Sequence, residues 1–165
     1  MKRILFIAFL LCSFAATSIA QDEFTTFILI RHAEKADDGT NNPGLTTEGT
    51  ERADRLSALL TDTDVAAIYS TPFKRTMSTV TPLASAKGLD IQEYNPRGQE
   101  FIKTMLKDNA GKTIVVSGHS NTTPVVANIL LGNKQFENLT EDEYGKIFIV
   151  TVSSLGVGTV TLMSY

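Results

Sequence analysis

The sequence predicts an α/β fold, a three-layer α/β/α sandwich around a mostly parallel central sheet. Strand-like and helix-like segments alternate along the chain, which is the pattern of parallel strands joined by crossover helices. The apolar, β-favouring runs at residues 27–30 and 113–117 are typical of strands buried on both faces. No repeat, low-complexity tract or Pro/Gly/Ser-rich linker divides the chain, so we expect a single domain.

The first elements are expected to be a strand, a helix and a second strand. Residues 24–30 form an apolar run and predict a buried strand. Residues 46–60 predict an amphipathic helix, because leucines and an alanine recur at helical spacing behind Thr46, which has the side chain of a helix cap. Residues 65–69, rich in β-branched and aromatic residues, predict the second strand.

A proline and a glycine delimit the next predicted helix. We expect Pro72 to be its first residue, with Ser70 or Thr71 as the cap, because proline is favoured at the first helical position. Gly88 is expected to end the helix, since glycine readily adopts the left-handed conformation found there. Residues 90–94 then predict a third, weaker strand.

The second half continues the alternation and ends in two strand-like segments. Residues 99–107 predict a short helix, residues 113–117 the most apolar strand, and residues 123–131 another helix. Residues 146–152 and 156–163 predict two further strands around a short turn. These two strands either pair with each other as a hairpin or extend the sheet. An antiparallel strand at the edge of the sheet is therefore possible.

The N-terminal residues have the features of a cleavable export signal. Lys2 and Arg3 precede an apolar run at residues 4–14, and small residues follow at positions 18 and 20. The apolar run is shorter than the roughly 20 residues that a spanning helix needs. We therefore expect a signal peptide at residues 1–20 and an exported domain at residues 21–165, in the periplasm or outside the cell. An uncleaved anchoring helix is the alternative.

The bulk properties of the mature domain exclude several classes of protein. Cys12 is the only cysteine and would be removed with the signal, so neither a disulfide nor thiol chemistry is expected. Removal of two basic residues would change the net charge from −3 to −5. Without a basic patch, nucleic acid is not an expected partner. No later segment is apolar enough for stable membrane insertion, and the sequence leaves the oligomeric state open.

Four cationic or titratable side chains are expected to meet at one edge of the sheet. Arg31 and His32 end the first strand, His119 ends the fourth, and Arg75 lies in the first turn of the helix after the second. In open α/β sheets ligands bind at the carboxyl ends of the strands, where helix N-termini add positive potential. Guanidinium groups bind phosphate oxygens in pairs, so a small phosphorylated substrate is the expected ligand.

A histidine in such a cluster can also react with the phosphate it helps to bind. A neutral imidazole is a competent nucleophile near pH 7. In-line attack by His32 on phosphorus would give a phosphohistidine, which water would then hydrolyse. Arg31, Arg75 and His119 would stabilise the charge on the equatorial oxygens in the transition state.

Four stretches resemble the signatures of the histidine phosphatase superfamily, also called the phosphoglycerate-mutase-like family. They occur in the family's order and span most of the mature chain. The resemblance implies His32 as the phosphorylated nucleophile, a phosphate pocket of Arg31, Arg75 and His119, and a compact branch-one protein that needs neither metal nor cofactor. The stretches are Arg-His-Ala-Glu at 31–34, Leu-Thr-Thr-Glu-Gly at 45–49, Tyr-Ser-Thr-Pro-Phe-Lys-Arg-Thr-Met-Ser-Thr at 69–79, and Ser-Gly-His-Ser at 117–120.

The general acid is the least defined part of the predicted site. Many branch-one members carry a glutamate soon after the third strand, which makes Glu93 the nearest candidate for the acid and Glu100 the next, although the residues around Glu93 favour an ordinary strand or loop carboxylate. Ser120 and Asn121 stand where phytase-like members carry an acid. A catalytic metal is not expected, because the chain has two histidines, no His-x-x-x-His pair and two arginines that would repel a dication.

These observations favour an exported phosphatase that hydrolyses phosphomonoesters through a phosphohistidine on His32. The resemblance implies a metal-independent phosphoric monoester hydrolase similar to histidine acid phosphatases. One alternative is a non-catalytic phosphate-binding or envelope-interaction module that keeps the pocket without turnover. Another is a phosphoglycerate-mutase-like phosphotransferase, which would require that residues 1–20 are not an export signal.

Overall fold

The computed structural model describes residues 23–165, which form one six-stranded sheet and four helices. The predicted signal peptide lies outside the described residues. Between residues 23 and 165, none of the helices has the length and hydropathy that a membrane span requires. The strands are β1 (Thr25–Arg31), β2 (Val65–Ser70), β3 (Ile91–Glu93), β4 (Thr113–Gly118), β5 (Lys146–Ser154) and β6 (Val157–Ser164). The helices are α1 (Thr47–Leu59), α2 (Lys74–Lys87), α3 (Glu100–Asp108) and α4 (Thr123–Leu131).

The strands lie in the order β3-β2-β4-β1-β5-β6. The pairings among β3, β2, β4 and β1 are parallel, whereas β5 runs antiparallel to β1 and β6 antiparallel to β5. The predicted α/β class and mostly parallel sheet are therefore confirmed. The two alternatives for the last strands both hold, because β5 and β6 form a hairpin that also extends the sheet. The antiparallel part thus has two strands instead of one edge strand.

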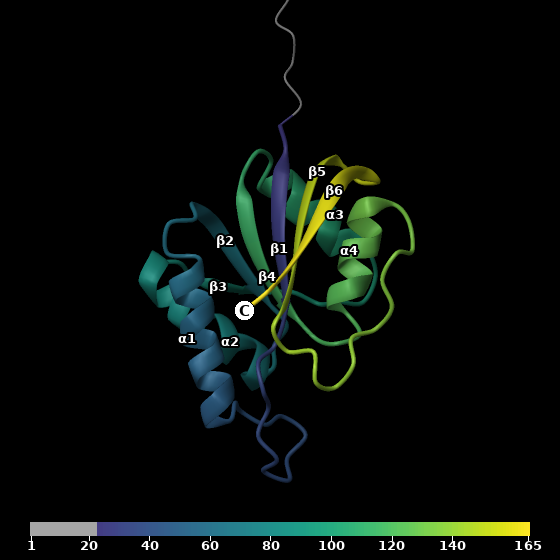
Figure 1. The fold of residues 1–165 in the computed structure, drawn as a ribbon. Coiled ribbons are helices and arrows are strands. Elements are labelled where there is room, and N and C mark those ends of the chain that lie inside the picture. Colours follow the sequence, from purple (N-terminus) through teal and green to yellow (C-terminus); the bar gives the residue numbers. More distant parts are fainter. Residues whose placement is uncertain (1–22) are drawn as a thin grey trace, which may run out of the picture.

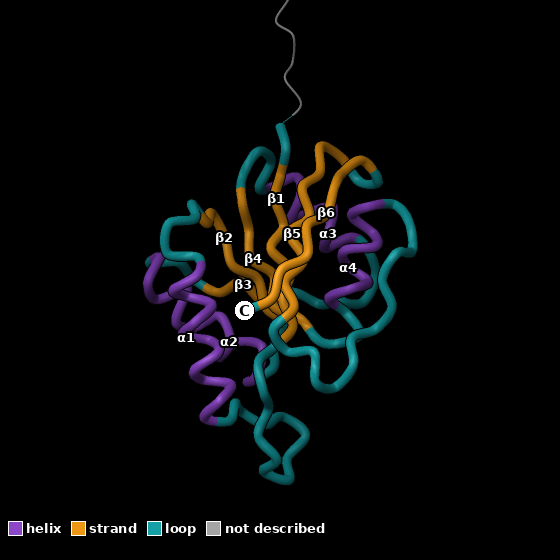
Figure 2. The backbone as a smooth tube through the Cα atoms, viewed as in Figure 1, coloured by secondary structure: helices purple, strands orange, loops and turns teal. Residues whose placement is uncertain are grey.

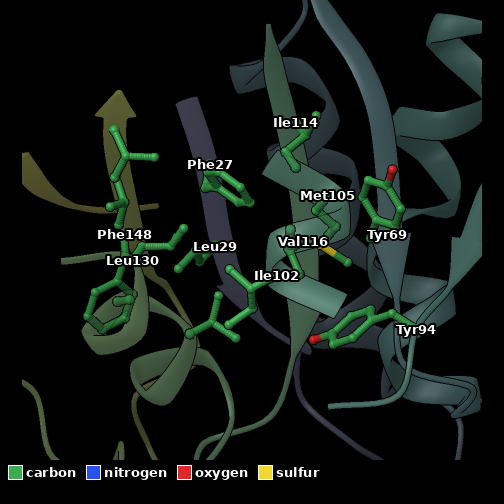
Figure 3. Close-up of a cluster of buried hydrophobic side chains, with 14 of the residues drawn as sticks. Phe27, Leu29, Tyr69, Tyr94, Ile102, Met105, Ile114, Val116, Leu130 and Phe148 are labelled. Atoms are coloured by element: carbon green, nitrogen blue, oxygen red, sulfur yellow. The ribbon is translucent and has the colours of Figure 1, made fainter. Parts of the chain in front are cut away.

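Helices cover both faces of the sheet, as Figure 1 shows, with α1 and α2 on one face and α3 and α4 on the other. Alternate residues of β1 supply both layers of the core. Phe27 and Leu29 pack against α3 and α4, whereas Ile28 and Ile30 pack against α1 and α2. Figure 3 shows the first of these layers, with Ile102 of α3 close to the β1 side chains. Each such fully buried side chain contributes about 1.5–3 kcal/mol.

The predicted cap of α1 and the predicted end of α2 are confirmed, whereas the predicted start of α2 is wrong. Thr46 caps α1 as expected, since its side chain accepts a hydrogen bond from the peptide N–H of Gly49. Gly88 ends α2 in the left-handed conformation, with φ of +64°. The predicted start of α2 at Pro72 is wrong, because the helix begins at Lys74 without a side-chain cap. The hydroxyl of Thr71 makes contacts at the site instead of capping the helix.

The strand register brings the predicted site residues to one edge of the sheet. Arg31 pairs with Gly118 across β1 and β4, and Ser70 pairs with Ser117 across β2 and β4. The three parallel strands therefore end at the same level. Figure 2 shows the loop after β1 and the loop between α4 and β5 extending from this edge. A ligand bound there would face both loops and the N-termini of α2 and α4.

Candidate active site

The structure brings the four predicted residues together in one pocket. Arg31, His32, Arg75 and His119 all line a cavity of about 1120 Å³ at the carboxyl edge of the sheet. The ring centroids of the two histidines are 5.5 Å apart, with their planes at 67°. The Arg75 guanidinium lies 3.5 Å from Nδ1 of His119. Residues that are as much as 88 positions apart in the chain thus form a single cluster.

His32 is held with one ring nitrogen committed to the backbone. Its peptide N–H donates to the carbonyl of Gly118, and its Nδ1 lies 2.8 Å from the carbonyl oxygen of Ala33. A carbonyl oxygen only accepts hydrogen bonds, so Nδ1 carries the proton and Nε2 keeps its lone pair. Burial is the largest cause that lowers the pKa of His32 to about 4; the bond to Ala33 opposes the shift and nearby positive charge adds to it. The imidazole is therefore neutral at pH 7.

The loop that presents His32 is fixed from α2. The peptide N–H of Ala33 donates to the hydroxyl of Thr79, which itself donates to the carbonyl of Arg75. Both threonine bonds are shorter than 3 Å, at 2.8 and 2.7 Å. The residue after the histidine is therefore tied to the same helix turn that carries the predicted phosphate-binding arginine.

Hydrogen bonds to both ring nitrogens fix the orientation of His119. Its Nε2 lies 2.9 Å from the hydroxyl oxygen of Thr71, and its Nδ1 faces the Arg75 guanidinium. A guanidinium only donates, so Nδ1 accepts and the Nε2–H donates to Thr71. The Thr71 hydroxyl in turn donates to Thr76. Burial, followed by the charges of Arg75 and Arg31, lowers the pKa of His119 to about 4.

A glycine allows α4 to begin close to this histidine. The peptide N–H of His119 donates to the hydroxyl of Thr122 at 2.8 Å, and this hydroxyl makes no capping hydrogen bond to α4 although Thr122 directly precedes the helix. A Cβ placed on Gly118 would come within 2.8 Å of that same hydroxyl oxygen. The Ser-Gly-His sequence therefore needs glycine because strand and helix approach closely here.

Arg31 is almost completely buried, and the loop between α4 and β5 surrounds its guanidinium. Nη1 donates to the carbonyl of Thr140 at 2.6 Å, and Nη2 lies 3.4 Å from the Glu141 carboxylate. The guanidinium carbon lies 4.2 Å from the centre of the Tyr144 ring, a cation–π distance. These contacts come from a segment more than 100 residues away in sequence.

Each arginine also has a buried nitrogen without a hydrogen-bond partner in the described part of the chain. Nε of Arg31 and Nε of Arg75 are buried and have no hydrogen-bond acceptor among residues 23–165. The guanidinium of Arg75 lies 4.6 Å from the centre of the Phe73 ring, and burial lowers its pKa. Buried donors are nearly always paired in folded proteins. Two guanidinium groups beside two neutral histidines in one pocket suit a bound oxyanion.

Two acidic side chains line the pocket, of which the sequence indicated only Glu93. Glu93, the predicted acid, lies exposed at the end of β3 and does line the pocket. Glu141 lines it too, with its side chain 78% exposed. Residues 95–98, which follow β3, also line the pocket.

Sequence reasoning missed the side chains that hold the predicted residues in place. Thr71 and Phe73 lie inside a recognised stretch, and their position between a strand end and Arg75 was the available signal. Thr140, Glu141 and Tyr144 lie in a segment without helix or strand periodicity, so nothing in the sequence connected them with Arg31. Among the described residues, no three His, Cys, Asp or Glu side chains gather to hold a metal ion.

Comparisons with known proteins agree with this geometry. Residues 27–95 match the family model of the histidine phosphatase superfamily (branch 1). No curated protein matches the chain. The fold resembles the protein histidine phosphatase SixA in complex with tungstate, with a TM-score of 0.69, 19% identity, and 84% of this chain and 96% of that chain covered.

Two other solved structures show the same likeness at low identity. A mycobacterial glucosyl-3-phosphoglycerate phosphatase matches with a TM-score of 0.70 and 10% identity, over 86% of this chain and 98% of that chain. A phosphoserine phosphatase from Entamoeba histolytica matches with a TM-score of 0.66 and 17% identity, over 83% of this chain and 95% of that chain. At such identities the likeness establishes a shared fold.

Proposed function

We propose that this chain, which belongs to branch 1 of the histidine phosphatase superfamily, hydrolyses phosphomonoesters through a phosphohistidine on His32. The observation that carries the proposal is the state of His32: a neutral imidazole whose Nδ1–H is fixed to Ala33, so that Nε2 is the nucleophile. The tungstate complex of SixA supports it, because tungstate is a tetrahedral oxyanion like phosphate.

The first step transfers the phosphoryl group to the enzyme. Nε2 of His32 attacks phosphorus, the N–P bond forms, and the P–O bond to the alcohol breaks. Arg31, Arg75 and His119 surround the equatorial oxygens, where charge changes during transfer. The phosphorylated imidazole becomes positive, and the Ala33 carbonyl accepts from the Nδ1–H that shares this charge.

The second step returns the enzyme to its starting state. Water attacks phosphorus and the N–P bond breaks; one proton of the water stays on the inorganic phosphate, and the other goes to the carboxylate that protonated the leaving alkoxide in the first step. The departing alkoxide of the first step needs a proton, for which Glu93 stays the predicted donor and Glu141 is a second carboxyl at the pocket. Both carboxyls are exposed, so exchange with solvent is open to either.

The protein is further proposed to act after export and without a metal. Basic, apolar and small-residue segments at the start of the sequence support removal of residues 1–20. N-terminal sequencing of the protein secreted by its expression host tests this. Cleavage after residue 20 is expected, and an intact N-terminus in the cytoplasm would favour a mutase-like phosphotransferase instead.

Hydrolysis of p-nitrophenyl phosphate in EDTA tests the catalytic proposal. The full chain should turn over, and His32→Ala should lose activity by several orders of magnitude and fail to retain radiolabelled phosphate. Arg55→Ala removes an exposed cation from α1, away from the pocket, and should retain activity. A folded protein that binds phosphate without turnover would favour the binding module, and activity that survives in His32→Ala would exclude the phosphohistidine.

A further inference from the structure

The pocket is much larger than a phosphate group, and apolar side chains form part of its lining. Its volume of about 1120 Å³ compares with sites that hold drug-sized ligands, roughly 300–1,000 Å³. Arg31, Arg75 and the histidines occupy one side. The apolar side chains that line it are Pro72, Phe73, Tyr94, Pro96, Phe101, Val125, Val126 and Ile129.

Two of these side chains form an apolar strip along α4. Val125 and Ile129 are one helical turn apart, so they share a face of the helix. Both also line an adjoining depression of about 470 Å³ near the C-terminal end of α4. The other residues that line this depression are mostly polar, so the apolar strip consists of Val125 and Ile129 themselves. Val125 is 47% exposed although it is large and apolar, which the core does not explain.

Two aromatic groups also line the pocket. The rings of Tyr94 and Phe101 are stacked, with centroids 4.9 Å apart and planes at 27°. Tyr94 is almost fully buried and its hydroxyl donates to the carbonyl of Ser117, which fixes the ring. Phe101 packs partly against the core at the start of α3. An apolar group bound in the pocket would find carbon surface on this stack as well as on α4.

Charge separates the two parts of the pocket. The phosphate end carries two guanidinium groups, whereas the strip of Val125 and Ile129 carries no charge. Lys35, Arg97 and two glutamates stand elsewhere around the pocket. A ligand that complements this surface has a dianionic end and an apolar body, and a sugar phosphate would place hydroxyl groups against carbon, where they lose hydrogen bonds to water.

We propose that the substrates are phosphomonoesters of apolar alcohols, aryl or alkyl, whose carbon body contacts α4 and the Tyr94–Phe101 stack. The inference rests on the proposed phosphatase function and specifies its substrate class. The phosphate would bind at Arg31 and Arg75, and the apolar body would cover Val125. Contact with an apolar body at this face contributes binding in proportion to the carbon surface that it removes from water.

Two substrate pairs with matched leaving groups test the proposal in the full chain. Hexyl phosphate is compared with glycerol 3-phosphate, since both release a primary alkanol, and 1-naphthyl phosphate with phenyl phosphate, since both release a phenol. We expect kcat/KM to be about tenfold or more higher for hexyl phosphate than for glycerol 3-phosphate, and for 1-naphthyl phosphate than for phenyl phosphate. A higher kcat/KM within only one of the two pairs shows whether an alkyl or an aryl group fits the pocket.

A variant pair connects any such preference to α4. Val125→Ser should lower the ratio of kcat/KM for hexyl phosphate over glycerol 3-phosphate by about fivefold. Leu59→Ser is the matched control, because Leu59 is a helix residue that is 45% exposed on the other face of the sheet, and its ratio should not change. Equal kcat/KM within both pairs, or equal ratios in wild type and Val125→Ser, would overturn the inference while leaving the phosphatase function intact.

If none of the four esters were hydrolysed, the proposed function would fail, and binding would still test the apolar strip. Calorimetry with 1-naphthyl phosphate and phenyl phosphate would then measure the same comparison without turnover. Tighter binding of the naphthyl compound, weakened in Val125→Ser and not in Leu59→Ser, would support an apolar ligand. Equal affinities would contradict it.

Discussion

Replacement of Thr71 by valine should impair the site through His119 without changing the shape of the side chain. The Thr71 hydroxyl accepts from Nε2–H of His119 and donates to Thr76. Valine leaves the buried Nε2–H without an acceptor, which costs about 1–3 kcal/mol. Thr76 loses only an accepted bond, because its own hydroxyl already donates to backbone carbonyls. We therefore expect the free energy of unfolding to fall by about 1–3 kcal/mol.

The same change should slow the reaction, because His119 loses the contact that fixes its tautomer. A proton that moves to Nδ1 would face the Arg75 guanidinium, a donor opposite a donor. Misorientation of the His119 ring beside the transferring phosphoryl group should remove about 1.4 kcal/mol or more of transition-state stabilisation, a tenfold or greater fall in kcat/KM. The assays are steady-state hydrolysis and nitrogen NMR of the histidine tautomers.

Thr25→Val is the matched control for this experiment. Thr25 is equally buried, and its hydroxyl also has two hydrogen-bond partners, but it lies at the opposite end of β1. The Thr25→Val protein should have a similarly reduced free energy of unfolding and the kcat/KM of the wild type. If Thr71→Val lost stability but kept kcat/KM and the His119 tautomer of the wild type, the role assigned to the Thr71 hydroxyl would be wrong.

Three further changes should have measurable effects. Glu141→Gln removes a carboxylate beside Arg31 and should lower the inhibition constant of inorganic phosphate about two- to fivefold at low salt. The pKa of His32 is lowered to about 4, so the unfolded chain binds more protons than the folded chain between about pH 6.5 and 4. Acidification through this range should therefore lower the free energy of unfolding, with a contribution of roughly 3 kcal/mol from this group. Urea titration at several pH values measures the change. Gly118→Ala places a methyl group against the Thr122 hydroxyl and should lower the melting temperature by several degrees.

Each of these effects has a control or a contradicting outcome. Glu137→Gln changes an exposed glutamate of the same loop that pairs with Lys134, and phosphate inhibition should not respond to it. His32→Gln should flatten the decline of stability with acid, and an unchanged decline would show that His32 does not titrate as expected. A Gly118→Ala protein with wild-type stability would mean that α4 moves away without cost.

The sequence was sufficient where local chemistry and tertiary structure agree. The apolar run of β1 ends at Arg31 and His32 because charged and titratable groups belong at the open edge of a buried strand. The cap at Thr46 and the glycine at the end of α2 depend on neighbouring residues only, so both could be predicted. The convergence of Arg75 and His119 followed from the parallel order of the strands.

The remainder depends on contacts that are distant in sequence. Pro72 looks like a helix start, but the Thr71 hydroxyl is held by Thr76 and His119, and the helix begins two residues after the proline. The surroundings of Arg31 come from a loop without periodicity. No local pattern distinguishes Glu141 from other exposed carboxylates, although it reaches the same pocket as Glu93.

The position of β1 between β4 and β5 has a consequence for the order of folding. The strand that emerges first from the ribosome pairs with residues 113–118 and 147–152, so its hydrogen bonds are completed almost last. Such high contact order slows folding, and the apolar run of β1 stays uncovered meanwhile. Since the Arg31 guanidinium also waits for Thr140 and Tyr144, a partly synthesised chain has the first histidine but cannot assemble the anion site.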